Sequence, residues 1–197
     1  SGFDRQLKLS ILSMQSHLQI TAPGYLIDDE ASSAIRHPER IVDAISELGG
    51  QAAPIIEGPV MVQVRDRAVG KVVRGIIPER ENHVTKLKQY VDGRYAIREG
   101  EALIGSHLAA ELGLVIGDTL LIHSPANLTS NFVWDDAGGV RAKEQSEVYL
   151  PEEVTIAGLF TVGVYEYDSA LVVVHLDQAA DLFGFPWGAA TKVHGKV

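Results

Sequence analysis

The 197-residue chain contains no cysteine, and this absence removes two kinds of structure. Neither a disulfide framework nor a thiolate metal site can form without it. A chain without cysteine suits a bacterial extracytoplasmic protein that avoids unwanted oxidation, although many cytosolic domains also lack this residue. The absence therefore restricts the chemistry of the protein without fixing its compartment.

Basic residues are also scarce. Lysine and arginine number 17 against 26 aspartates and glutamates, which gives a net charge of −9. Binding to nucleic acid depends on basic side chains that neutralise phosphates, and docking on anionic lipid depends on a similar excess. The net charge therefore argues against both kinds of partner.

Long apolar runs are missing as well. No stretch of 18 apolar residues occurs, and no charged segment followed by an apolar one opens the chain. The composition, 46% hydrophobic and 22% charged, is ordinary for a folded domain and allows one large domain or two small ones. Because SGFDRQLK begins abruptly and HGKV ends in a strand-like pattern, we expect a part of a longer protein.

Motifs for cofactors and metals are absent too. No phosphate-binding loop and no G-x-G-x-x-G after a strand is present, so we expect no nucleotide cofactor. The seven histidines form neither H-x-x-x-H nor H-E-x-x-H, so a zinc site would have to be assembled from distant elements. We expect no metal, and we interpret His123 and His175, at predicted strand ends, as hydrogen-bonded structural residues.

The stretch GSHLAAELGLVIGDTLLIHSP, residues 105 to 125, allows two interpretations. Ser106 and His107 are adjacent and Asp118 follows, which suggests a catalytic triad. However, adjacent residues on a helix point about 100° apart, and no G-x-S-x-G elbow is present. We therefore favour a structural interpretation and assign no catalytic residue.

The structural interpretation is a helix followed by a turn and a strand. Leu108, Ala109 and Leu112 recur at helical intervals, and Gly113 follows as a C-cap. The Gly117–Asp118 pair then predicts a turn into a strand over 120–122.

The rest of the chain alternates helical and strand-like patterns, which predicts an α+β fold. Helices are expected over 3–16, 82–91 and 176–184, and over 38–48, where Pro38 suits the first position and Ile41, Val42, Ile45 and Leu48 form one face. Strands are expected over 17–22, 51–66 (an edge or bent strand, because of Pro54 and Pro59), 68–78 (with possible bulges at Gly70 and Gly75), and near the C-terminus. Residues 154–175 predict two strands around a Tyr-Glu-Tyr-Asp turn.

Two carboxylates, Glu166 and Asp168, flank Tyr167 in this predicted turn. Paired carboxylates can serve glycoside hydrolysis, but alternating residues at a hairpin tip are more often surface residues. Residues 125–150 differ from their surroundings because they are polar and rich in turn residues, apart from Phe132, Val133 and Trp134.

Several motifs resemble those of one family, the periplasmic core domain of type VII ABC transporter permeases, which includes MacB and the lipoprotein-releasing LolC and LolE. The first motif is G-x-x-L-A-x-x-L-G-x-x-x-G-D-x-x-x-L, found here as Gly105, Leu108, Ala109, Leu112, Gly113, Gly117, Asp118 and Leu121. SGF at the start, VRGIIPE, and the segment containing Gly158, Phe160, Gly163, Tyr165, Glu166, Asp168, Ala179 and Leu182 are similar to further family segments. The Tyr-Glu-Tyr-Asp stretch favours the lipoprotein-releasing branch.

The resemblance implies a MacB-like core in two parts. A porter-like α/β part would comprise 1–64 with 186–197, and a β-rich part called the sabre would comprise 65–185. In the family the porter-like part continues beyond the point that corresponds to Val197, so we expect its second half to be missing here. The motif glycines and acids would be structural, and the chain would need no cofactor.

The resemblance also implies a function at the bacterial inner membrane, with this domain in the periplasm. Its partners would be a second permease subunit, a cytoplasmic ATPase acting through membrane helices, a lipoprotein substrate and a LolA-like periplasmic carrier. Residues 125–150 occupy the place of the family's Hook hairpin, which recruits the carrier. Phe132, Val133 and Trp134 would then bind the carrier, while DDAGG supplies a hairpin reversal. The alternatives are a MacB-like mechanotransmission domain of a peptide or drug exporter, and a hydrolase.

Overall fold

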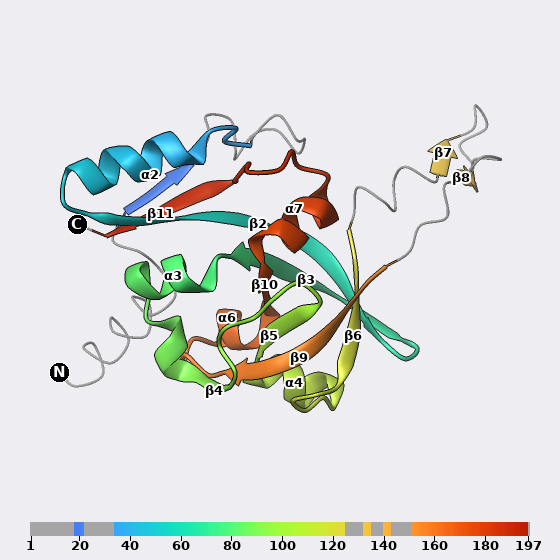
Figure 1. Ribbon diagram of the computed structural model, residues 1–197. Coiled ribbons are helices and arrows are strands. Elements are labelled where there is room, and N and C mark those ends of the chain that lie inside the picture. Colours follow the sequence, from blue (N-terminus) through green and yellow to red (C-terminus); the bar gives the residue numbers. More distant parts are fainter. Residues whose placement is uncertain (1–17, 22–33, 125–131, 135–139, 143–150, 197) are drawn as a thin grey trace.

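Six β-strands close into a ring in the computed structural model, which describes residues 18–21, 34–124, 132–134, 140–142 and 151–196 (Figure 1). Around the ring they are β2 (Gln51–Val64), β3 (Arg67–Ile76), β10 (Leu171–His175), β5 (Glu101–Gly105), β9 (Glu152–Phe160) and β6 (Thr119–His123). β6 closes the ring because it pairs with both β9 and β2. β10 is parallel to β3, and β5 is parallel to β9, while the other pairs in the ring are antiparallel.

Apolar side chains fill the inside of this ring, as expected for a small barrel. Each ring strand contributes residues to one core, and α4 (Ser106–Leu112) and α7 (Leu176–Phe183) add Leu108 and Leu176 to it. The fully buried members include Ile56, Val73, Ile104, Leu120, Ile156 and Val174.

A second core lies on the other face of the same strands. In β10, Val172 and Val174 belong to the inner core, whereas Leu171 and Val173 belong to the outer one. This alternation explains why the strand is an unbroken apolar run, since both of its faces are buried. The outer core is covered by α6 (Tyr165–Ala170), the short helix η2 (Leu87–Tyr90) and β4 (Val91–Gly93), which pairs with β9.

A smaller layer extends from the first half of β2. β11 (Lys192–Lys196) pairs with β2 on one side and with β1 (Leu18–Thr21) on the other, and α2 (Pro38–Glu47) packs on these strands (Figure 1). Ile45 of α2 forms a small core here with Ala52 and Val193. The predicted apolar face of α2 is correct at Ile45 but wrong at Leu48, which is 79% exposed.

The strand expected over 51–66 is present as β2, but the edge alternative of that prediction is wrong, because β2 runs through the interior of the sheet. Its residues 51–55 pair with β11 and its residues 56–64 pair with β3. Pro54 lies in the first part and Pro59 in the second, before β6 joins at Met61. Among the described strands, each proline therefore has a neighbour on one side of β2 only, so a residue without an N–H group is tolerated there.

Three further local predictions are wrong. β2 and β3 pair without a register shift across Gly70 and Gly75, so neither glycine is a bulge; a Cβ at Gly75 would instead collide with Ala179 of α7. The helix expected at 82–91 is replaced by α3 (Pro78–Val84), which begins at a proline, and by η2. The Tyr-Glu-Tyr-Asp segment begins the helix α6 and is not a turn between strands.

The other predicted elements agree with the structure. The strand at 17–22 is β1, α2 begins at Pro38, and the helix-turn-strand of 105–123 consists of α4 and β6. The helix predicted over 3–16 lies outside the described residues. Among the described helices, none has the length and apolar character needed to span a membrane.

Candidate functional site

The two family motifs meet where α6 packs on the end of β5. Gly105 is the last residue of β5, and a Cβ added there would lie only 2.8 Å from the Cα of Asp168 and closer still to its carbonyl group. Such a distance is too short for any side chain atom, so a residue with no Cβ is required at this position. The contact brings together a glycine of the first motif and an aspartate of the last one.

The side chain of Asp168 holds the loop that leads into α6. Its Oδ1 accepts a hydrogen bond from the Val162 N–H at 2.8 Å, and its Oδ2 accepts one from the Gly163 N–H at 2.9 Å. Asp168 is 2% exposed, and Gly163 has a positive φ of 81° that favours glycine. The motif residues Gly163 and Asp168 therefore have structural roles. The glycine allows the loop conformation, and the carboxylate on α6 holds the loop in place.

The first motif continues through α4 into a turn fastened on β9. Gly113 ends the helix in the left-handed conformation, as predicted, with φ 67°. In the turn, the Asp118 carboxylate accepts from the Val115 N–H at 2.9 Å, and the backbones of Gly117 and Asp118 both bond to Ile156. The turn predicted at this glycine is therefore present, and Gly117 has φ 97°.

The residues of the triad interpretation are not brought together. The Asp118 carboxylate bonds within its own turn, whereas the ring of His107 packs edge-on against Tyr165 at 5.5 Å between centroids. The Ser106 hydroxyl accepts from Thr161 at 2.8 Å. Ser106 and His107 do line one shallow surface pocket, which does not include Asp118. Its lining residues are Ser106, His107, Ala110, Glu111, Tyr165 and Ser169.

Glu166 and Asp168, the other candidate pair, have different environments. Glu166 is exposed in the first turn of α6, whereas the Asp168 carboxylate is buried and bonded to two N–H groups. An acid and a base working on one substrate would need both groups at one accessible place. The arrangement instead suits a structural role for Asp168.

The segment at 125–150 contains a β-hairpin. β7 (Phe132–Trp134) pairs antiparallel with β8 (Val140–Ala142), so that Trp134 lies opposite Val140. These two strands form a sheet of their own, which pairs with none of the described strands of the large sheet, and Figure 1 draws them away from it. The expected reversal DDAGG, residues 135–139, links the two strands and lies outside the described residues.

A buried group of charges, which the sequence analysis missed, joins the ring to the smaller layer. Glu57 of β2 binds Arg74 of β3 at 2.7 Å and Lys192 of β11 at 2.8 Å. Burial alone would raise the pKa of Glu57, but the charges of Arg74 and Lys192 outweigh it and lower this pKa to about 2. The carboxylate therefore stays ionised and links three strands.

A second polar pair lies next to this group. The Oε1 of Glu81 on α3 lies 3.3 Å from Nδ1 of His194 on β11 and accepts from the Thr85 hydroxyl at 3.2 Å. The side chains of Glu81 and His194 are at most 3% exposed. Among the described residues, Glu81 Oε2 has no hydrogen-bond partner. These contacts tie α3 to the last strand, close to where that strand pairs with β2.

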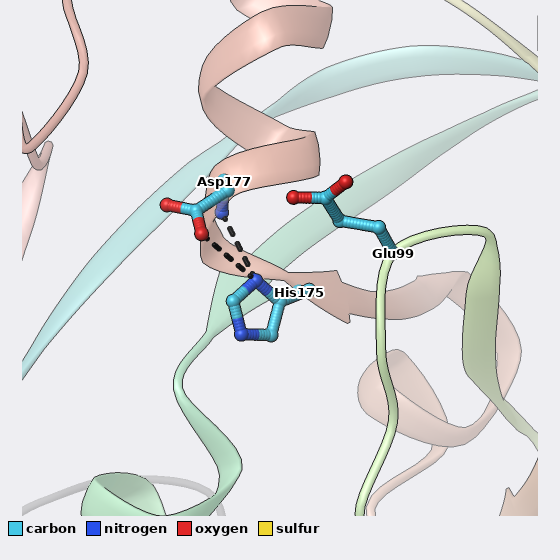
Figure 2. A group of neighbouring side chains, drawn as sticks. All are labelled: Glu99, His175 and Asp177. Carbon is cyan, nitrogen blue, oxygen red and sulfur yellow. Dashed lines mark hydrogen bonds and ion pairs between the residues drawn. The ribbon is translucent and has the colours of Figure 1, made fainter.

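A third group lies where the turn before β5 meets the start of α7 (Figure 2). Glu99 precedes β5, His175 ends β10, and Asp177 begins α7; one ligand atom from each lies within 4.8 Å of the others. His175 makes the kind of hydrogen bond that its position suggested, because its Nδ1 caps α7 by accepting from the Asp177 N–H at 3.4 Å. The sequence could not predict this cluster, because no local motif links position 99 to position 175.

Comparison with known proteins gives relatives in sequence and in fold. No family model matches the chain. The lipoprotein-releasing system transmembrane protein LolC of Xylella fastidiosa is 28% identical over 182 residues, which cover 90% of this chain and 39% of that protein. LolC of Neisseria meningitidis serogroup B is 25% identical over 195 residues, covering 93% of this chain and 40% of that protein. The chain thus spans about two fifths of these relatives.

Two solved structures share the fold. The extracellular domain of the noncanonical ABC-type transporter YknZ from Gram-positive bacteria aligns with a TM-score of 0.54 at 14% identity, over 90% of this chain and 80% of that one. The periplasmic region of MacB from Actinobacillus actinomycetemcomitans aligns with a TM-score of 0.53 at 8% identity, over 89% of this chain and 71% of that one. Both comparisons confirm the resemblance that the motifs indicated, and the structures confirm the expected α+β, MacB-like fold.

Proposed function

We propose that this chain is the periplasmic domain of a lipoprotein-releasing ABC transporter permease of the bacterial inner membrane. It couples ATP hydrolysis in a cytoplasmic ATPase subunit to the transfer of lipoproteins from that membrane to a LolA-like periplasmic carrier. The observation that carries the proposal is the similarity to LolC, which extends over 90% of the chain at 28% identity. The domain itself performs no catalysis, and a second permease subunit pairs with it.

The proposed domain division gives the strand β2 a mechanical role. The porter-like part (1–64 with 186–197) contains β1, α2, β2 and β11, and the sabre part (65–185) contains the rest of the ring. Because β2 pairs with β11 along one half and with β3 along the other, force applied to the smaller layer reaches the ring through one continuous strand. The ion pairs of Glu57 with Arg74 and Lys192 bridge the same junction and stiffen it.

The hairpin of β7 and β8 is the proposed carrier-binding arm. It forms a sheet separate from the ring, and it contains Phe132, Val133 and Trp134 in an otherwise polar segment. Aromatic residues on such an arm are typical anchors for a partner's apolar cavity, and tryptophan contributes strongly to such contacts. Since the segment is matched to the family's Hook by location, a binding measurement is the appropriate test.

The test compares two tryptophans that differ in position. Trp134→Ala should weaken binding to the cognate LolA-like carrier by roughly 2 kcal/mol or more, while the melting temperature stays nearly unchanged. The matched control is Trp187→Ala, because Trp187 is 89% exposed but lies between α7 and β11. Binding constants would be measured by calorimetry or surface plasmon resonance. If Trp134→Ala, or deletion of 128–145, binds the carrier as tightly as the parent, the arm does not recruit it.

A MacB-like exporter domain is the second candidate, because the fold of the MacB periplasmic region is shared. In that case the domain would transmit motion to a periplasmic adaptor during export of peptides or drugs. The two candidates differ in their soluble partner. Binding of a carrier through the hairpin supports lipoprotein release, whereas binding of an adaptor with no affinity for the carrier supports the exporter.

A further inference from the structure

Three side chains that offer lone pairs face one another at the start of α7 (Figure 2). The Nδ1 of His175 accepts a hydrogen bond from the Asp177 N–H, so its lone pair points toward the first turn of the helix. The Oδ2 of Asp177 lies 3.4 Å from the same nitrogen, and the Glu99 carboxylate completes the group. In this tautomer Nδ1 has one lone pair, so a cation bound there would replace the long hydrogen bond from the Asp177 N–H. The two carboxylates offer further lone pairs and repel each other unless a cation lies between them.

No basic side chain fills that place among the described residues. No described lysine or arginine forms an ion pair with Glu99 or Asp177, and the ring of His175 is the neighbour of the Asp177 carboxylate. Other acids on the same surface are neutralised, as Glu101 is by Arg94. The helix N-terminus stabilises the Asp177 carboxylate only to a small degree, because water and salt screen its partial charge at an exposed site. The two carboxylates therefore leave an excess of negative charge.

The backbone around the cluster is held in place by hydrogen bonds outside it. The Gly100 N–H donates to Oε1 of Gln178 on α7 at 3.1 Å, and the Gly100 carbonyl accepts from Thr155 of β9 at 2.8 Å. Gln178 is only 7% exposed, so this connection between the loop and the helix is partly buried. The backbone of Gly100, next to Glu99, is therefore held in place beside α7. The exposed side chain of Glu99 can still change its rotamer to reach a ligand.

We propose that Glu99, His175 and Asp177 bind one divalent cation of the zinc class, with water at the fourth position. Ligands at about 2.1 Å from a tetrahedral ion lie roughly 3.4 Å apart, which is the observed separation of His175 Nδ1 and Asp177 Oδ2. Glu99 has to move closer, because the set spans up to 4.8 Å. One imidazole with two carboxylates suits Zn²⁺ better than Mg²⁺ or Ca²⁺, which prefer oxygen ligands alone.

Such an ion would connect the loop before β5 to the junction at which β10 passes directly into α7. The site is separate from the hairpin of β7 and β8, and it does not depend on the proposed transport function. It also replaces the expectation from the sequence that the chain binds no metal, because the ligands come from distant elements and no histidine motif announces them.

Calorimetric titration of the 197-residue chain with ZnCl₂ near neutral pH tests the site. We expect saturable binding of one Zn²⁺ per chain, with a higher melting temperature in its presence. Glu99→Gln and Asp177→Asn should each weaken binding by more than about tenfold, since even loss of an outer-shell partner costs this much. MgCl₂ at the same concentration should not compete.

Two control variants separate the site from general surface binding. Asp181→Asn removes an exposed carboxylate from the same helix, and His37→Gln removes the exposed pair of His37 with Glu39; neither should change the affinity. Equal Zn²⁺ affinity in the parent, Glu99→Gln and Asp177→Asn would overturn the proposal. So would a parent chain that shows no saturable Zn²⁺ binding.

Discussion

Gly105 and Asp168 are in contact through their backbones, with no room for a Cβ between them. The glycine ends β5 and the aspartate lies in the middle of α6. Two residues from different motifs, 63 positions apart in the sequence, thus form one packing contact, the Gly105–Asp168 joint. The same aspartate fastens the preceding loop through its carboxylate. The joint explains these motif residues by packing and hydrogen bonding, without any catalytic chemistry.

Gly105→Ala should therefore destabilise the fold. The new methyl group would collide with the backbone of Asp168, which cannot turn aside as a flexible side chain could. We expect the free energy of unfolding to fall by about 1–3 kcal/mol, the usual cost of overpacking. The matched control is Gly70→Ala, since nothing lies within 4 Å of a Cβ there. Denaturant unfolding of the two variants checks this; an equal, small loss in both would contradict the packing argument.

Asp168→Asn should separate the hydrogen-bonding role of this residue from its packing role. The amide keeps the size of the side chain but turns one acceptor into a donor that faces the N–H of Val162 or Gly163. We expect a loss of about 1–3 kcal/mol in unfolding free energy, the cost of leaving a buried group unsatisfied. Glu166→Gln, on the exposed side of the same helix, should change stability little. Equal stability of the two variants would remove the proposed role of the carboxylate.

Local sequence patterns correctly predicted those helices and strands for which several local features indicate the same element. In α4 the periodic apolar residues and the left-handed Gly113 point to the same helix, and its neighbour β6 follows a glycine turn. The resemblance in the motifs also indicated the fold that the solved structures share. Where one local rule stood alone, tertiary structure overrode it. Pro54 and Pro59 suggested an edge or bent strand. The edge alternative is wrong because β2 changes its partner along its length and leaves each proline with one neighbour.

The clusters of charged residues could not be predicted because their members are far apart in the sequence. Glu57 and Lys192 are separated by 135 positions, and they meet because β2 and β11 lie side by side. The same holds for Glu99 and His175, which β5 and β10 bring together. The helix at 165–170 was missed for a different reason. This helix has only six residues, and it is held by the hydrogen bonds of Asp168 to the preceding loop. A helix this short produces no apolar periodicity by which the sequence could indicate it.

Gly117→Val should damage folding, because this residue has a positive φ of 97° in a turn bonded to β9. A β-branched side chain is strongly disfavoured in such a conformation, whatever space surrounds it. The expected cost is roughly 1–3 kcal/mol in unfolding free energy. Nothing lies within 4 Å of a Cβ at either Gly117 or Gly70, but only Gly117 has a positive φ, so Gly70→Val is the control. An unchanged melting temperature in Gly117→Val would show that the turn tolerates the residue.

The pH dependence of stability should reveal the carboxylate of Glu57. Its pKa is lowered from 4.5 to about 2 in the folded chain, so the folded state binds this proton less readily than the unfolded state does. Its contribution, on the order of 3 kcal/mol, is therefore fully present well above pH 4.5 and is lost as the pH falls toward 2. Urea unfolding measured between pH 7 and pH 3 should show this decline in the parent.

Glu57→Gln identifies the group responsible. At pH 7 the variant should lose about 3–5 kcal/mol, because Arg74 and Lys192 would be left buried without their partner. Its stability should then depend less steeply on pH than that of the parent, since the titrating carboxylate is gone. The control Glu47→Gln, at an exposed position on α2, should keep both the parent's stability and its slope. If the parent and Glu57→Gln decline in parallel on acidification, other carboxylates govern the acid response, and the three-strand ion pair does not hold the ring to the smaller layer.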